Sequence, residues 1–394
     1  TPPPHHGQSY MVKLMLDGFA DPRHGIECHH VNARFSRELA DVGEFQGGKL
    51  FLVFWFCAVA IWIRFRHGVK NFYYVPAPSK RVALYRDWLV MLLCRPFFEK
   101  VILHWHAAGL GKWLETSNPI FARAATYRLF KPVDLSIVLS RHNIADGEKF
   151  LSRHVCLVNN GIADPCPDFE KTILPRRKAR LEARRKLLAN EPLLPMECKA
   201  AGGDPQVVKV LFLAHCMKEK GLFDALEGVV LANWQLHQAN SPLRLELTVA
   251  GEFVSPQERM EFDQCLSMLA SKDAGKTRVN YLGFVSGPAK TQAFSESDCF
   301  CFPTYYHAES FGLVVVEAMA FGLPVVTTRW RSIPEIMPPG YPGLVDTQSP
   351  KQVADALIHL MSEHSGEWAR QNFSTRFTLA NHLAALAAAL RSVE

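Results

Sequence analysis

The stretch that decides the fold is residues 303–324, which read PTYYHAESFGLVVVEAMAFGLP. The apolar residues before it, 299–302, are typical of a buried strand, and the stretch itself predicts a helix over 311–321. Ser310 can cap the start of this helix, and Gly322 suits its end because glycine adopts the left-handed backbone that closes many helices. A helix that begins at the carboxyl end of a parallel strand lies where doubly wound sheets bind ligands.

The start of this predicted helix is suited to a phosphate group. The amides of Phe311, Gly312 and Leu313 would lie at the positive end of the helix dipole, and Gly312 would let a ligand approach the backbone. Glu309 precedes the helix and Glu317 lies two turns inside it, so on the order of 10 Å separates them along the axis. That span matches a nucleotide diphosphate sugar, with one carboxylate on the ribose and the other on the sugar.

A structural role for Glu317 is the alternative. It interrupts the apolar run 313–319 of a helix that packs on a sheet, where a charge needs a partner. We expect the functional role for the pair.

The carboxy-terminal half alternates short apolar runs with helical stretches, which predicts a doubly wound Rossmann-like domain. The strands are expected over 207–214, 245–251, 279–283, 299–302, 324–328 and 344–345. The helices are expected near 221–238, 256–271, 287–296, 311–321 and 350–362.

The first half shows the same order less cleanly. Its strands are expected over 26–32, 71–75, 101–106, 135–140 and 155–158. The chain opens on TPPPHHGQ, which resembles the loop after a first strand, so we expect the first strand of this domain to be missing.

The composition limits the classes of protein to which the chain can belong. The chain has 394 residues, 48% of them hydrophobic, and a net charge of +6. These values exclude a disordered chain and suggest two or three domains of about 150 residues. The mild positive charge favours phosphate or anionic-membrane partners and is too weak to argue for nucleic acid.

The cysteines and the apolar runs bear on the compartment. Ten cysteines are scattered without metal-site spacing, so we expect buried, reduced thiols in a cytosolic chain. The longest apolar run, 50–63, is shorter than the ~20 residues of a spanning helix and is expected to be buried or interfacial. The first residues do not have the pattern of a signal peptide.

The segment 165–206 separates the two halves and contains the basic run 176–186, RRKARLEARRK. Two interpretations are open: a solvated helix, or a patch that contacts anionic lipid head groups.

Several motifs together resemble glycosyltransferase family 4, whose members are retaining enzymes of the GT-B fold. The pair Glu309 and Glu317, followed by AMA-x-G-x-PVV, resembles the Glu-x7-Glu signature of that family. The other resembling segments, in chain order, are 2–7 (first loop), 103–106 (His-x-His strand end), 158–162 (Asn-Gly-Ile), 215–221 (Arg-x4-Lys-Gly), 282–285 (base-reading loop) and 366–386 (terminal helix).

The resemblance implies an α/β GT-B architecture with two Rossmann-like doubly wound domains that face a cleft. Residues 1–164 would form the acceptor domain, and 207–375 the nucleotide-sugar domain. Residues 165–206 would be a basic linker or insertion, and 376–394 a helix that crosses back to the first domain.

The resemblance also implies roles for residues of the donor site. Glu309 would orient the transferred sugar, and Glu317 would bind the ribose. Lys220 and the amides of residues 310–313, from Ser310 to Leu313, would stabilise the leaving diphosphate. Val285 would read the base through its backbone.

Three residues outside that domain complete the implied site. His106 would face the sugar or the acceptor, whereas His104 would point the other way and pack. Gly7 would let the first loop close on the diphosphate. Asn160 would either bond the acceptor or brace the cleft.

One position departs from the family pattern: His215 stands where the family has arginine. A guanidinium grips phosphate bidentately at any pH, whereas the charge of histidine depends on pH. A structural role and a phosphate contact are both open for His215. The sequence has no Asp-x-Asp motif, and we expect neither a metal nor another cofactor.

The predicted activity is transfer of a sugar from a nucleotide diphosphate sugar to an acceptor hydroxyl with retention, plausibly in polysaccharide or glycolipid assembly. The alternatives are a nucleotide-sugar 2-epimerase, a non-catalytic nucleotide-sugar-binding homologue, and a synthase with a soluble sugar acceptor. The acceptor would be a sugar or a lipid-linked sugar.

Aromatic and basic residues of the first domain raise the question of a membrane. The stretches 50–62 and 88–98, with Arg95, could dock on an anionic membrane together with nearby basic residues, or could simply cover the sheet. The basic residues are Arg64, Arg66, Lys80 and Arg81. We expect a cytoplasmic protein, and the membrane alternative would place it peripherally on the inner face of the membrane.

Overall fold

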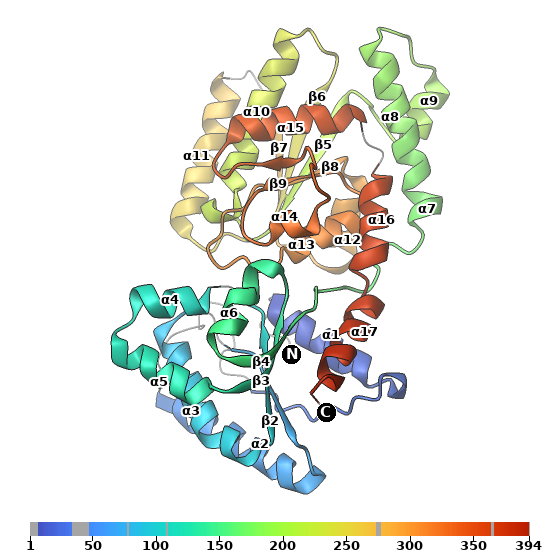
Figure 1. Cartoon of the computed structure of the whole chain (residues 1–394). Coiled ribbons are helices and arrows are strands. Elements are labelled where there is room, and N and C mark those ends of the chain that lie inside the picture. The colour runs from blue at the N-terminus through green and yellow to red at the C-terminus, as the bar shows by residue number, and fades with distance from the viewer. Residues whose placement is uncertain are drawn as a thin grey trace. The chain divides into compact units, whose positions relative to one another are not determined.

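The computed structural model describes residues 7–33, 47–76, 79–107, 109–272, 277–363 and 366–393 (Figure 1). The chain folds into two compact units. The first unit is Thr1–Ile162 with Ala308–Phe311 and Leu379–Glu394, and the second is Ala163–His307 with Gly312–Thr378.

The first unit contains a parallel sheet in the order β1-β2-β3-β4. The strands are β1 (Asn71–Tyr74), β2 (Lys100–Trp105), β3 (Val133–Val138) and β4 (Ser152–Leu157). Four of the five strands predicted for this half are therefore confirmed. The fifth prediction, 26–32, is wrong, because that segment has no strand pairing and its polar residues, including Glu27 and His30, stay exposed.

Helices cover both faces of this sheet. Successive side chains of a strand point to opposite faces, and here the side chains on both faces are mostly apolar and need cover. Ile102 and Ile137 pack on one face against Leu386 and its neighbours, while Leu103 and Val138 pack on the other. The helices are α1 (Gly7–Phe19), α2 (Gly47–His67), α3 (Arg81–Cys94), α4 (Leu110–Ser117), α5 (Ile120–Phe130), α6 (Ile144–Lys149) and α17 (Leu379–Arg391).

The second unit contains a parallel sheet in the order β10-β9-β8-β5-β6-β7. Its strands are β5 (Val207–Leu213), β6 (Arg244–Ala250), β7 (Arg278–Gly283), β8 (Cys299–Phe302), β9 (Val325–Thr328) and β10 (Leu344–Val345), and all six were predicted. The order runs outward in both directions from the β5–β8 pair, so this pair is the topological switch point of a doubly wound sheet.

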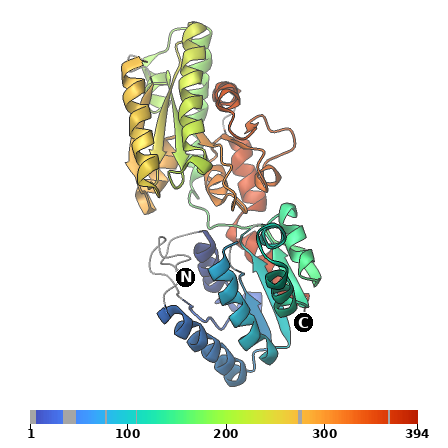
Figure 2. The same ribbon diagram turned by 90° about the vertical axis from the view of Figure 1, so that its left-hand side faces the viewer.

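Helices also surround the second sheet, and α10 and α11 run along its strands (Figure 2). They are α7 (Phe169–Thr172), α8 (Leu174–Leu188), α9 (Pro195–Ala200), α10 (Leu222–Gln238), α11 (Pro256–Lys272), α12 (Gly287–Glu296), α13 (Leu313–Ala320), α14 (Ile333–Ile336), α15 (Pro350–Glu363) and α16 (Glu367–Arg376). The buried strands are continuous apolar runs, as a parallel sheet that is covered on both faces requires.

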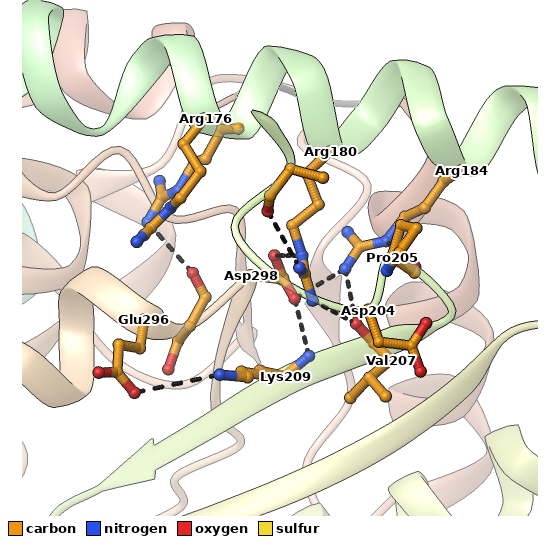
Figure 3. Close-up of polar contacts among 12 residues, drawn as sticks. Arg176, Arg180, Arg184, Asp204, Pro205, Val207, Lys209, Glu296 and Asp298 are labelled. Atoms are coloured by element: carbon orange, nitrogen blue, oxygen red, sulfur yellow. Dashed lines mark hydrogen bonds and ion pairs between the residues drawn. The ribbon is translucent and has the colours of Figure 1, made fainter. Parts of the chain in front are cut away.

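Three arginines of the basic run lie on the face of α8 that packs on the domain. Arg177, Arg180 and Arg184 are only 6%, 6% and 4% exposed. Arg180 and Arg184 form ion pairs with the buried carboxylate of Asp298, at 2.8 and 2.7 Å (Figure 3). For these three arginines both the solvated helix and the lipid patch are wrong, because their spacing places them on one helix face that packs on the domain.

Two further findings concern the compartment. Within the part of the chain that the structure describes, no helix combines the length and apolarity needed to cross a bilayer. All ten cysteines are free thiols, and the predicted burial is confirmed for six of them, including Cys299 and Cys301. It is wrong for Cys28, which is exposed.

Candidate functional site

The candidate site lies at the carboxyl ends of β5 and β8, the two strands of the switch point. Hydrogen bonds join the loops that follow these strands. The amide of Tyr305 donates to the carbonyl oxygen of Glu219 at 2.8 Å, and His307 Nδ1 lies 2.9 Å from Glu219 Oε2. The structure therefore brings together the motif 215–221 and residues 303–307 of the second motif, all within the second unit.

Lys220 is held in this loop pair by aromatic rings. Its Nζ lies 4.3 Å from the ring centroid of Tyr306, which is cation–π distance. The following residue, Gly221, has φ +84°, and a Cβ there would lie 2.3 Å from the carbonyl oxygen of Pro303. Glycine is thus required for the close approach of the two loops, and it positions Lys220 directly before α10.

His215 does not replace the family arginine as a permanent cation. Burial lowers the pKa of His215, and the positive charge of Lys220 lowers it further against the opposing effect of Glu252. At neutral pH the imidazole is therefore uncharged and can offer a phosphate one N–H donor. Whether His215 contacts a phosphate stays a prediction.

Helix α13 begins later than predicted, at Leu313. The N-cap is Gly312, with φ +79°, so the prediction of Ser310 as the cap is wrong. The physical reason is the tight turn: the Phe311 ring is buried, and a Cβ on Gly312 would lie 2.6 Å from Ile333 Cδ1. No side chain of the N-cap residue occupies the start of α13, which keeps this helix end suited to an anion.

Glu317 has a partner that the sequence did not reveal. Lys290, in the first turn of α12, donates to Glu317 Oε1 at 2.6 Å. The side chains of Lys290 and Glu317 are 31% and 20% exposed, so the pair is largely shielded. Because the two residues are 27 positions apart, no local pattern could have indicated their contact.

Val285 lies where the base-reading loop was expected, between β7 and α12. This places it in the same unit as Lys220, Leu313 and Glu317. Glu309 and Ser310 fall in the segment Ala308–Phe311, which belongs to the first unit.

His106 follows the end of β2 in the first unit, and His104 is buried, which confirms its predicted packing. The prediction that His104 points away from His106 is wrong, because their ring centroids lie 4.1 Å apart; residues two apart on a strand share one face. Burial holds the pKa of His104 well below its usual value, and His106 and His382 lower it further. His104 Nδ1 and the hydroxyl of Tyr73 form a hydrogen bond.

Asn160 is also buried, and its Oδ1 accepts no hydrogen bond from the described residues. Gly7 is the first residue of α1 and is exposed, while the preceding loop residues 2–6 lie outside the described residues. The structure therefore leaves the predicted roles of Asn160 and Gly7 untested. Among the described residues, no group of three or more His, Cys, Asp or Glu side chains could hold a metal ion.

Residues 208–363 match the family described as glycosyl transferases group 1. The D-inositol 3-phosphate glycosyltransferase of Corynebacterium urealyticum is 28% identical over 62% of this chain and 53% of its own length. The phosphatidyl-myo-inositol mannosyltransferase of Mycobacterium leprae is 37% identical over 21% of this chain and 22% of its own length. The chain thus spans about half of the length of the first relative and about a fifth of the length of the second.

Solved structures show the same fold. The chain is similar to HepE of Anabaena in complex with UDP and glucose, with a TM-score of 0.57 and 16% identity over 89% of this chain and 84% of that one. It is also similar to the sucrose-phosphate synthase of Thermosynechococcus elongatus, with a TM-score of 0.58 and 19% identity over 89% and 80% of the two chains.

Proposed function

We propose that the chain, which has the GT-B fold, is a glycosyltransferase of the group 1, family 4-like type, and that it transfers a hexose from a nucleoside diphosphate sugar to an acceptor hydroxyl with retention of configuration. The observation that carries this proposal is the junction of the two loops at the switch point. There Lys220 and the start of α13 stand at the carboxyl ends of adjacent strands, where such sheets bind nucleotides.

The donor would be bound by groups of complementary charge. Lys220 and the first turn of α13 would hold the diphosphate, and Glu317 would accept hydrogen bonds from the ribose hydroxyls. The ion pair with Lys290 fixes the Glu317 carboxylate and leaves Oε2 for the ribose. Val285 would contact the base through its backbone.

The transfer step would rest on electrostatic stabilisation of the leaving group. The bond from the anomeric carbon to the diphosphate breaks, the acceptor oxygen bonds to that carbon on the same face, and the acceptor proton passes to the leaving phosphate. Lys220 and the α13 amides would stabilise the charge that develops on the diphosphate. Glu309 would orient the sugar, and His106 and Asn160 keep their predicted roles toward sugar and acceptor.

Metal independence is part of the proposal. The ammonium of Lys220 and the positive end of α13 would supply the charge that a cation supplies elsewhere. We expect EDTA to leave the transfer rate within about twofold of its value, and strict dependence on added Mg²⁺ would contradict this part of the proposal.

A membrane-bound acceptor is supported by the outer face of α2. Five aromatic residues at helical spacing on this helix are exposed: Phe51, Phe54, Trp55, Trp62 and Phe65. The opposite face, with Val53 and Cys57, is buried, and α2 packs beside α3 (Figure 2). An exposed aromatic stripe of this length, on a helix whose opposite face is buried, is typical of an interfacial surface.

The charges beside α2 divide into two groups. Arg66, Lys80 and Arg81 are exposed and would face anionic lipid, although Arg81 also donates to the carbonyl oxygen of Ser117. Arg64 donates to the carbonyl oxygen of Phe97, and Arg95 donates to the carbonyl oxygens of Leu129 and Pro132, so these two brace the protein. We propose a protein on the cytoplasmic face of a membrane that acts on a lipid-linked sugar in glycolipid or polysaccharide assembly. The lipid acceptor in the name of the Mycobacterium leprae relative supports this assignment.

Flotation with phosphatidylglycerol vesicles tests the membrane part. The double variant Trp62→Ser/Phe65→Ser should lose most vesicle binding at low salt. The matched control is Ile120→Ser/Phe121→Ser, which removes exposed apolar side chains from α5 of the same unit. Equal binding by wild type and the α2 variant, or equal loss in both variants, would contradict the assigned surface.

The donor is found by a screen of UDP-, GDP- and ADP-sugars. One of them should raise the thermal midpoint and then release nucleoside diphosphate slowly in the absence of acceptor. Binding without any release would favour a non-catalytic nucleotide-sugar-binding protein.

A further inference from the structure

A cavity of about 200 Å³ lies under α8 in the second unit. Its charged lining comes from α8, from β5 and from the segment that joins α12 to β8 (Figure 3). The charged lining residues are Arg176, Arg177, Arg180, Lys209, Glu296 and Asp298. Because Asp298 precedes β8, the cavity is at the amino end of this strand, whereas the candidate site is at its carboxyl end.

The carboxylates do not balance the cations of this cavity. Asp298 is already shared by Arg180, Arg184 and the amide of Lys209, which donates to Oδ2 at 2.9 Å. Glu296 lies 4.0 Å from the ammonium of Lys209 and also accepts a hydrogen bond from Gln292 Nε2 at 2.8 Å. Four cations against two carboxylates leave a positive excess in the lining, which is unfavourable in a shielded space.

Among the cations of the lining, Arg177 has a buried N–H group without a hydrogen-bond acceptor in the part of the chain that the structure describes. The residue is 6% exposed, and its guanidinium donates only to main-chain oxygens, those of Gly322 and Ser297. No described residue accepts a hydrogen bond from Arg177 Nε. Burial lowers the pKa of this guanidinium to about 10, although Asp298 opposes the effect. A buried donor without an acceptor destabilises the protein unless a ligand supplies one.

The backbone at Gly202 leaves room for the side chain of Arg176. A Cβ on Gly202, whose φ is +70°, would lie 2.6 Å from Arg176 Cδ. The missing side chain at this position therefore allows Arg176 to lie over the cavity, where its guanidinium also donates to the carbonyl oxygen of Ser295.

We propose that this cavity binds a phosphate group, either as free phosphate or as part of a small phosphorylated sugar, at a site separate from the donor site. Guanidinium groups present paired N–H donors that match phosphate oxygens, and Lys209 adds a point charge. The inference rests on the lining alone and is independent of the proposed transferase activity.

The test is a titration with inorganic phosphate and, separately, with glucose 6-phosphate, at ionic strength held constant with sodium chloride. The readouts are the thermal midpoint and the amide hydrogen exchange of residues 201–206, which include the lining residues Ala201 and Gly202. We expect a saturable rise in the thermal midpoint and a saturable fall in the exchange rate for the wild type. Glucose 6-phosphate acting at lower concentration than phosphate would identify a phosphorylated sugar as the better ligand.

Variants assign the effect to the cavity. Lys209→Gln should weaken phosphate binding roughly tenfold, the effect of one charge-assisted hydrogen bond, and Arg176→Gln should do likewise. Lys209 is half-exposed, so its variant should fold even if an Arg177 variant does not. Lys178→Gln is the matched control, because Lys178 lies on α8 and pairs outward with Glu367. Lys220→Gln should also bind as the wild type does.

Three results would overturn the proposal. The first is no saturable response of the wild type. The second is an equal loss in the Lys178 and Lys209 variants, which would indicate diffuse charge attraction. The third is loss in the Lys220 variant alone, which would assign the phosphate to the donor site.

Discussion

Replacing Lys290 with methionine tests whether Glu317 is a binding group that the ion pair holds in place. The change removes the charge and keeps a side chain of similar length. Glu317 would lose the donor that lies 2.6 Å from Oε1 and would be free to rotate or to draw in water. Since Glu317 would bind the ribose in both the ground state and the transition state, the loss should appear in the KM for the donor.

The magnitude follows from the geometry of the pair. A hydrogen bond to a charged group contributes about 1.5–3 kcal/mol, but Lys290 is 31% exposed and the pair is partly screened by solvent. We therefore expect about 1 kcal/mol, which corresponds to a rise of roughly fivefold in KM. The value of kcat should stay within about twofold, because the reacting centre is not changed.

Steady-state release of nucleoside diphosphate at varied donor concentration measures both constants. Lys290→Arg should retain most of the wild-type KM, because it restores a donor to Glu317. The matched control is Arg259→Met, which removes an exposed ion pair with Asp263 at 2.8 Å in the same unit and should leave KM unchanged. An unchanged KM in Lys290→Met, or a fall in kcat alone, would refute the role assigned to Glu317.

Three further predictions concern other sites. His215→Arg restores a permanent cation beside Lys220 and should lower the donor KM by roughly three- to tenfold at pH 7.5; no change would place His215 outside the phosphate contact. Burial lowers the pKa of His104 and of His382 in the folded protein, so as the pH falls the unfolded chain binds these protons more readily than the folded chain and the stability decreases. The thermal midpoint should therefore drop between pH 7.5 and 5.5, by less in His382→Gln, and an equal drop would contradict this assignment. Asp298→Asn leaves two buried guanidinium groups without their carboxylate and should cost about 3–5 kcal/mol in denaturant unfolding; a loss below about 1 kcal/mol would show that the cluster is not structural.

The predictable part of the fold is the part that local pattern determines. The central strands β5, β8 and β9 of the second sheet are short, mostly apolar runs between helical stretches, because a buried parallel strand is covered on both faces. The segment 26–32 was predicted as a strand and forms none. Its polar residues stay at the surface, and only Ile26 packs on the core.

The parts of the site that sequence reasoning missed depend on contacts between distant residues. The ion pair of Lys290 and Glu317 joins two helices, and Arg184 reaches Asp298 across 114 positions. A charge run such as 176–186 reads as a solvated face unless its buried partner is known. The cap of α13 was missed for a different reason, because a serine before the helix is the commoner cap and the turn at Gly312 depends on Ile333.

The measurement that tests the central claim most directly is sugar transfer by Glu309→Ala and Glu317→Ala, with the donor that the screen identifies and with the fold checked by circular dichroism and thermal midpoint. Each variant should fold as the wild type does and should lose transfer below about 1% of the wild-type rate, since several kcal/mol of donor binding and orientation would be gone. Full transfer by both folded variants would contradict the assignment of this carboxylate pair as the site of the reaction.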